Sequence, residues 1–301
     1  MQQSSPATTR FPAAGGAVAR LAGRSHRAQF VAKQPLATAG GLLVLAIILC
    51  ALLAPRIAPY GYATGQLSHA LEGPSSSHPL GTDWVGRDVL SRIIYGARSA
   101  VLVGFGASGA ALLLAALLGV AGSYYRHVDL GLQRLLDIWL SIPALILVLT
   151  ALSVFGTGLV QIIICVAVVL AAGASRIIRS RALAVAHTEY VSAAKATGAS
   201  DLRVLSRHIL PNVAPTIIVV STAQVGTAVL IEATLGFLGY GIPPPTPTWG
   251  QMLSIQGMAY FSTKPLLAIW PGLAIVAAVF GFNVLGDGLR DRLDPRMRGR
   301  R

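Results

Sequence analysis

Charged residues are scarce in this 301-residue sequence, at 12%, whereas hydrophobic residues make up 54%. Soluble globular domains carry roughly 25% charged residues. Acidic residues are the scarcest, with 11 Asp and Glu against 24 Lys and Arg. A chain with so little charge cannot cover a mainly water-exposed surface, which excludes an ordinary soluble domain.

Residues that build catalytic and metal sites are also few. The two cysteines, Cys50 and Cys165, lie inside apolar stretches, so neither a disulfide framework nor a cysteine metal site is predicted. The six histidines are scattered, and the HExxH and GxSxG motifs do not occur. We therefore expect no metal site and no hydrolase site.

The sequence contains no ATP-binding P-loop. The Walker A motif needs a lysine directly after a glycine. Each lysine here follows alanine or threonine; the three are Lys33, Lys195 and Lys264. We therefore expect that the chain is not an enzyme and binds no cofactor itself.

Long apolar runs are abundant. Six are long enough to cross a bilayer core, which needs about 20 apolar residues. They cover approximately residues 36–57, 99–125, 135–155, 159–178, 213–238 and 265–285. The first begins too late and is too long for a cleaved signal peptide. The sequence predicts an all-α membrane protein with six transmembrane helices, kinked at Pro143 and Pro271.

The distribution of basic residues predicts the orientation. With the N-terminus in the cytoplasm, 19 of the 24 Lys and Arg fall on the cytoplasmic side, as the positive-inside rule requires. Residues 1–34 contain no acidic residue and read as a disordered basic tail. Residues 290–301 read as a second basic tail, and both termini are expected in the cytoplasm. Topology and lipid contact explain the net charge of +13 without nucleic acid.

Glu232 is the acidic residue most difficult to explain inside a predicted span. A charged side chain at the bilayer centre costs about 2.5–3.5 kcal/mol on insertion scales. Glu232 is either paired inside the bundle, with Arg98 or a backbone amide at a helix break, or lines a translocation path. A proton relay would need more acidic or histidine residues than the spans contain.

The polar connection between the fourth and fifth spans predicts two short helices. The first begins at Glu189 and ends at Gly198, a candidate C-cap. The second covers 201–210, with Ser200 or Asp201 as N-cap and Pro211 at its end. Tyr190, Ala193 and Ala194 share one helical face. That face is either a docking surface for a partner or part of an ordinary surface helix-turn-helix.

This connection resembles the coupling-helix signature of ABC-importer permeases, which reads EAA, three residues, Gly, nine residues and then Ile-x-Leu-Pro. Ser192-Ala193-Ala194, Gly198 and the run His208-Ile209-Leu210-Pro211-Asn212 stand in these places. Ser192 departs from the usual Glu, and Glu189 on the same helix is a candidate for the missing negative charge. The resemblance implies that Glu189, Ser192, Ala193, Ala194, Gly198 and Pro211 couple the chain to an ATPase subunit.

Three further stretches resemble the corresponding segments of permeases for dipeptides, oligopeptides and nickel. They are His78-Pro79-Leu80-Gly81-Thr82-Asp83 with Gly86-Arg87-Asp88, Gly236-Phe237-Leu238-Gly239-Tyr240-Gly241 with Trp249-Gly250, and Gly286-Asp287-Gly288-Leu289-Arg290-Asp291. The likeness spans about residues 35–298. It implies a type I ABC-importer permease fold in a bacterial inner membrane. Residues 35–95 would form the first helix and an outer loop, and 96–289 the transmembrane domain with coupling helices at 189–210.

The resemblance also implies partners. These are a homologous second permease, two ABC ATPase subunits (or one fused pair) that hold ATP and Mg²⁺, and an extracytoplasmic binding protein. Pro244, Pro245 and Trp249 are candidates for docking that protein. Short peptides are the commonest cargo of such permeases, although these motifs do not distinguish peptides from nickel or another cargo.

Two other classes of membrane protein have different sequence requirements. A secondary transporter would need internal coupling sites and often inverted repeats. A membrane enzyme would need a clustered catalytic constellation.

Overall fold

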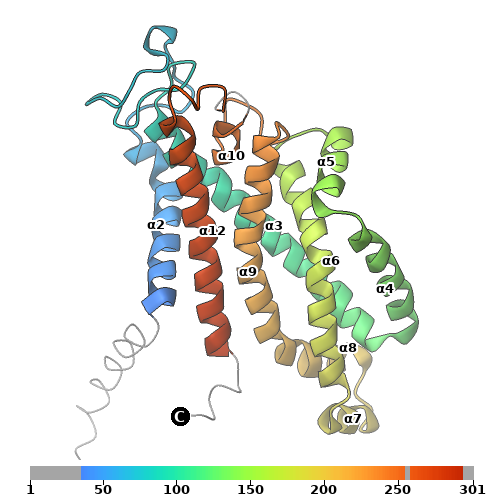
Figure 1. The fold of residues 1–301 in the computed structure, drawn as a ribbon. Helices are drawn as coiled ribbons and strands as arrows, with labels where there is room; N and C mark the ends of the chain where they lie inside the picture. The colour runs from blue at the N-terminus through green and yellow to red at the C-terminus, as the bar shows by residue number, and fades with distance from the viewer. Residues whose placement is uncertain (1–34, 255–257, 294–301) are drawn as a thin grey trace, which may run out of the picture.

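The computed structural model describes residues 35–254 and 258–293. The regular secondary structure of this part of the chain is helical, apart from two isolated β-bridges. Five of its helical segments are long and apolar enough to cross a membrane. They are α2 (Pro35–Ile57), α3 (Val89–Tyr124), α6 (Leu159–Ala186), the segment Asp201–Phe237, and α12 (Leu266–Leu293). Five of the six predicted spans are therefore confirmed (Figure 1).

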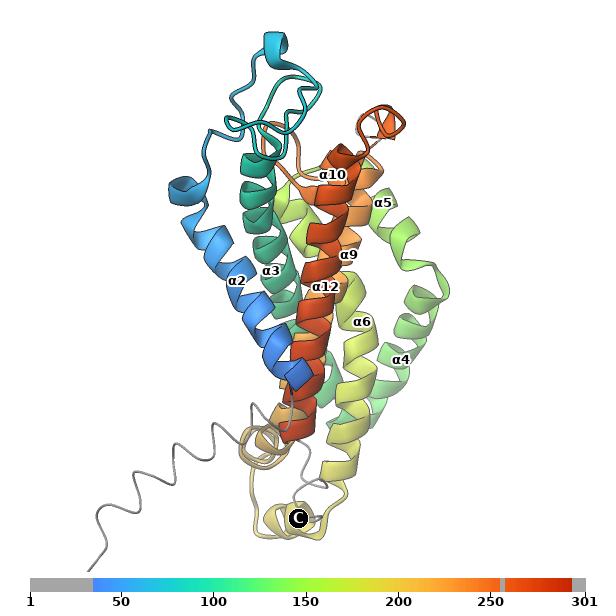
Figure 2. The same ribbon diagram turned by 60° about the vertical axis from the view of Figure 1, so that its left-hand side comes forward.

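The long helix α3 is central to the bundle and crosses it obliquely (Figures 1 and 2). Its buried stripe consists of small residues, including Ala107, Ala111 and Ala115, each 0% exposed. A Cβ on Gly119 would lie 2.8 Å from the carbonyl oxygen of Ser175 in α6. Small residues allow helix backbones to approach closely when lipid surrounds the bundle. This stripe therefore explains the tight α3–α6 packing.

The third predicted span, 135–155, is wrong as a single helix. It is divided between α4 (Arg126–Ser141) and α5 (Ala144–Phe155), which meet at 90°. Pro143 disfavours helical geometry at the preceding residue, and Ile142 is extended, with φ −94° and ψ 131°. At 1.5 Å per residue the 12 residues of α5 are too short to cross about 30 Å of hydrocarbon. The kink predicted at Pro143 is thus a full break, whereas α12 continues through Pro271.

The connection between α6 and the next span contains α7 (Glu189–Ala196), α8 (Asp201–Val204) and the π-helical turn η2 (Leu205–Ile209). The chain then continues as α9 (Leu210–Phe237). Pro211 therefore lies within the first turn of α9 and does not end a helix, contrary to the prediction. In the π turn, backbone amides donate to carbonyls five residues earlier instead of four. In an ordinary α-helix the ring of Pro211 would clash with the carbonyl four residues before it.

The two ends of the bundle differ in what they carry. We call the end with residues 58–88, η1 (Leu67–His69) and α10 (Trp249–Met252) the upper end, and the end with α7 the lower end (Figure 1). The N-terminal end of α2 and the C-terminal end of α12 both point toward the lower end (Figure 1). The predicted tail 1–34 lies outside the described residues, as do 294–301. Residues 290–293 of the predicted C-terminal tail belong to α12.

Candidate functional site

The predicted coupling residues gather at the lower end. Glu189, Ser192, Ala193 and Gly198 are exposed, and Ala194 is half-buried. Val191 alone in α7 is buried, at 0% exposure, and packs into the bundle core. α7 therefore has one buried anchoring side chain, and most of its remaining side chains are exposed.

Gly198 makes the sharp turn that ends α7. Its φ of +83° lies in the left-handed region, and a Cβ added at this position would have no atom within 4 Å. The amides of Gly198 and Ala199 donate to the carbonyls of Lys195 and Ala194, at 3.0 and 3.1 Å. The turn thereby satisfies carbonyls that the helix end leaves open. The predicted C-cap is confirmed as a structural feature.

Two ion pairs fix α4 to α6 at the lower end. Arg179 donates two hydrogen bonds to the carboxylate of Asp129, and Arg176 pairs with Asp137. Beside them a hollow of about 550 Å³ opens between α6 and α9. It is lined by Arg176, Ile177, Ser180, Arg181, Ala184 and Thr216. The hollow is basic, because Arg176 and Arg181 both line it.

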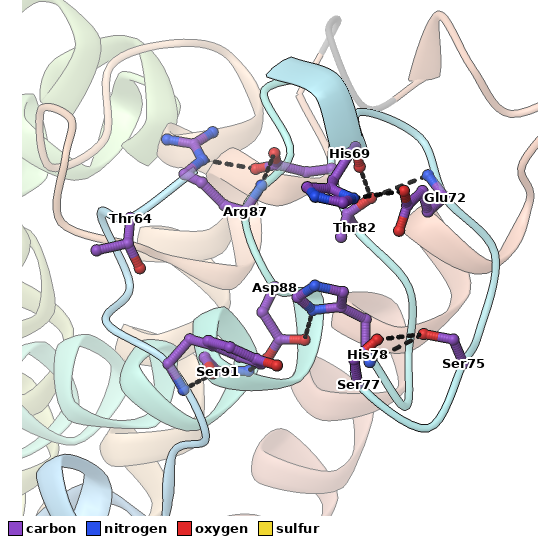
Figure 3. A network of polar contacts seen from close by, with 12 residues as sticks. Thr64, His69, Glu72, Ser75, Ser77, His78, Thr82, Arg87, Asp88 and Ser91 are labelled. Carbon is purple, nitrogen blue, oxygen red and sulfur yellow. Dashed lines mark hydrogen bonds and ion pairs between the residues drawn. The ribbon is translucent and has the colours of Figure 1, made fainter. Parts of the chain in front are cut away.

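The upper end is a dense polar network (Figure 3). Asp88 caps α3 by accepting from the Ser91 amide at 2.8 Å, and it also contacts Nδ1 of His78 at 3.0 Å. Asp83 accepts from Nε of Arg87 at 2.7 Å and lies 3.6 Å from Nε of Arg92. Asp83, Asp88 and Arg92 are 3%, 2% and 1% exposed. Buried charges are stable only when paired, so this network holds residues 58–88 rigidly on α3.

Residues 242–252 pack between α3 and α9 at the upper end. Ser99 donates to the carbonyl of Pro247 at 2.9 Å, and Nε1 of Trp249 donates to the carbonyl of Ile93 at 3.0 Å. Pro244 and Pro245 are exposed, as a docking loop requires, but Trp249 is only 3% exposed. Direct docking through Trp249 therefore conflicts with its place in this structure. Docking through Pro244 and Pro245 stays a prediction.

Glu232 lies inside the bundle, 1% exposed. Its side chain is hydrogen-bonded to Thr248, which also caps α10 by accepting from the Gln251 amide at 3.2 Å. Arg98 is exposed, so the predicted pairing with Arg98 is wrong. Oε1 of Glu232 has no hydrogen-bond partner among the described residues. Glu232 thus contacts the 242–252 segment, and a role in the translocation path stays a prediction.

Sequence reasoning missed two residues that connect these sites, Thr248 and Tyr124. Thr248 precedes a four-residue helix, and its position before Trp249 gave only a weak N-cap signal. Tyr124 ends α3, where tyrosines commonly mark the membrane interface. Its hydroxyl donates to Oδ1 of Asp201 at 2.5 Å.

The sequence of the chain is similar to those of known transport proteins. Residues 100–299 match the family model "Binding-protein-dependent transport system inner membrane component". Residues 30–74 match the model "N-terminal TM domain of oligopeptide transport permease C". The chain is 40% identical over 267 residues to "Dipeptide transport system permease protein DppC" of Alkalihalophilus pseudofirmus, covering 88% of each chain. It is 35% identical over 268 residues to "Glutathione transport system permease protein GsiD" of Pectobacterium atrosepticum, covering 88% of this chain and 89% of that one.

The fold also resembles a solved structure, described as "Inward facing conformations of the MetNI methionine ABC transporter". The TM-score is 0.56 at 19% sequence identity, and the match covers 67% of this chain and 96% of the other. At this identity the likeness concerns the fold alone.

Proposed function

Because the chain belongs to the family of binding-protein-dependent transport system inner membrane components, we propose that it is the channel-forming subunit of an ATP-driven importer of short peptides. Its similarity to transport permeases named for dipeptides and glutathione supports peptide-sized cargo. The chain is a multi-pass membrane permease, and the proposal adds its cargo, its partners and the way it is driven.

The proposed complex contains a homologous second permease, two ABC ATPase subunits (or one fused pair) and an extracytoplasmic binding protein. ATP and Mg²⁺ belong to the ATPase subunits, since this sequence has no Walker A lysine. The chain itself binds no cofactor in this proposal. The binding protein docks at the upper end, with Pro244 and Pro245 in its footprint.

We place the lower end in the cytoplasm of a bacterial cell and the bundle in its inner membrane. Basic side chains gather near that end, among them Arg176, Arg179, Arg181, Arg203 and Arg207. The ends of α2 and α12 that face the two chain termini lie there too. Both observations agree with the positive-inside rule and with cytoplasmic termini.

The continuity of α8, η2 and α9 is the observation that carries the mechanism. Residues 201–237 form one helical segment, so a displacement of α7 and α8 by an ATPase would move α9 as a lever. In the proposal Glu189, Ser192, Ala193, Ala194 and Gly198 meet the ATPase, and Pro211 begins the lever. Such rigid-body movement is how interfaces convert small shifts into closure.

The test substitutes Gly198→Asp in the complete transporter. The added side chain meets nothing in this chain, so the complex should still assemble, while coupling to the ATPase should be lost and ATP-driven uptake abolished. Gly239→Asp is the matched control for the cost of Asp in such a turn, since Gly239 has φ +86°, open surroundings and a place just after the other end of α9. Normal uptake by Gly198→Asp vesicles would overturn the coupling assignment.

A further inference from the structure

Tyr124 links the central helix to both short helices of the lower connection. It is the last residue of α3, and its hydroxyl donates to Oδ1 of Asp201, the first residue of α8, at 2.5 Å. Nζ of Lys195, in the last turn of α7, lies 4.3 Å from the centroid of its ring. One side chain from α3 therefore contacts α7 and α8 at the same time.

The chemistry of the two contacts is complementary. The phenol donates to a carboxylate, and hydrogen bonds to charged acceptors are stronger than those between neutral groups. The ring face attracts the ammonium group of Lys195. Asp201 also lies in the first turn of α8, where the helix dipole favours a negative charge. Tyr124 thus satisfies two opposite charges across the Gly198 turn.

The position of Tyr124 gives these contacts their importance. The chain itself joins α7 and α8 only to α6 and to η2 with α9. α3 is a separate element, and its 36 residues extend about 54 Å at 1.5 Å per residue. Its other end is fixed by the Asp88 network. A bond from Tyr124 therefore connects the lower connection to the helix on which the upper end is built.

We propose that Tyr124 is a positioning residue that fixes α7 and α8 relative to α3, so that displacement of α7 reaches α3 as well as α9. This inference rests on the proposed function for its coupling part. The positioning part concerns the chain alone and can be measured without transport. The two parts are therefore tested by separate measurements.

The first measurement is amide hydrogen exchange of the lower connection in the complete transporter in lipid nanodiscs. Tyr124→Phe removes the bond to Asp201 and keeps the ring beneath Lys195. Exchange at the Val204 and Leu205 amides, which donate to carbonyls in and next to the first turn of α8, should rise roughly fivefold. Tyr124→Leu should raise exchange at Thr197 and Gly198 as well. Tyr125→Phe is the matched control and should leave both sites unchanged.

A double-variant comparison identifies the partner. If the Tyr124 hydroxyl acts through Asp201, then Tyr124→Phe should cause no further rise in exchange when Asp201→Ala, which removes the acceptor, is already present. Independent, additive rises would show that the hydroxyl acts elsewhere and would overturn the assignment. Unchanged exchange in both Tyr124→Phe and Tyr124→Leu would overturn positioning, whatever the transporter carries.

The second measurement is the ratio of dipeptide taken up to ATP hydrolysed in proteoliposomes. Tyr124→Phe should lower this ratio roughly two- to fivefold. A purely structural role would lower the amount of complex and both rates together and leave the ratio constant, which would overturn the coupling part. If the wild-type complex takes up no dipeptide, the proposed function fails, and the exchange result still decides whether Tyr124 positions α7 and α8.

Discussion

The upper and lower ends of the bundle are held together by different kinds of contact. At the upper end the charged residues Asp83, Asp88 and Arg92 are at most 3% exposed. At the lower end the connection is held by the buried apolar side chains Val191, Val204 and Ile209 and by contacts of exposed side chains such as Lys195 and Asp201. Removing one partner of a buried pair is costly, whereas exposed pairs contribute little. The upper end is thus fixed by buried ion pairs, whereas the polar contacts of the lower connection can change at low cost.

Two glycines at the upper end are packed against neighbouring backbone. A Cβ on Gly86 would lie 1.9 Å from the carbonyl oxygen of Gln66, and one on Gly250 would lie 2.0 Å from that of Ala233. Both positions are at the upper end. At Gly198 in the lower connection, nothing lies within 4 Å. Rigidity and close packing therefore coincide at the end proposed to receive the binding protein.

The largest effect is expected for Gly250→Ala. The new methyl group would overlap the backbone of α9, and the backbone must move, at a cost of about 3 kcal/mol or more. Thermal unfolding in detergent measures the loss. Gly173→Ala in α6, where nothing lies within 4 Å, is the control and should be neutral or stabilising. A normal melting temperature for Gly250→Ala would show that the upper end is not closely packed.

Asp83→Asn should come next, since it leaves Arg87 and Arg92 without their counter-charge. We expect a loss of about 3 kcal/mol in the free energy of unfolding. The matched change at the lower end is Asp137→Asn, whose side chain is 63% exposed and whose loss should cost about 0.5 kcal/mol. Denaturant unfolding of both variants measures the difference. Equal losses would remove the contrast between the ends.

Substitution of Glu232 is expected to have an intermediate effect on stability, and the effect should depend on whether the new side chain can form a hydrogen bond. Glu232→Ala leaves the hydroxyl of Thr248, the residue that caps α10, without its carboxylate partner, which should cost about 2 kcal/mol. Glu232→Gln keeps a hydrogen-bonding group of the same size and should retain both stability and uptake. A stable Glu232→Gln protein without uptake would instead assign the carboxylate to the translocation path.

The smallest effect concerns the surface charge of α7. Glu189→Gln should weaken ATPase binding about two- to fivefold at low salt, because an exposed charge contact is worth about 0.5–1 kcal/mol, and should leave the stability of the chain unchanged. Adding Ser192→Glu to this variant should restore binding. Titration of the ATPase at two salt concentrations measures both. If Ser192→Glu fails to compensate, Glu189 does not replace the missing charge.

The length of the apolar runs was enough to predict the five uninterrupted spanning helices, because a run of about 20 apolar residues is long enough to cross the bilayer as one helix. It was not enough for 135–155, where hydropathy is high on both sides of the break at Pro143. The continuation through Pro211 depends on the π turn at 205–209, which local propensity does not reveal.

The sites were predicted where a motif lies on one segment and missed where two segments meet. Gly198 was found because a left-handed turn after a helix favours glycine. Trp249 was wrongly predicted to be exposed for docking, because its side chain packs against α3, a distant segment of the chain. A Cβ on Gly96 of α3 would lie 2.7 Å from the indole. The pairing of Glu232 with Thr248 and of Tyr124 with Asp201 joins residues far apart in the chain, which a single sequence does not reveal.

The most direct test of the proposed function is uptake of a labelled dipeptide by vesicles that contain the chain with the proteins that purify with it. We predict accumulation that requires ATP, a co-purifying Walker A ATPase, a second permease and the binding protein. Accumulation by this chain alone, without ATP, would contradict the proposal and indicate a secondary transporter.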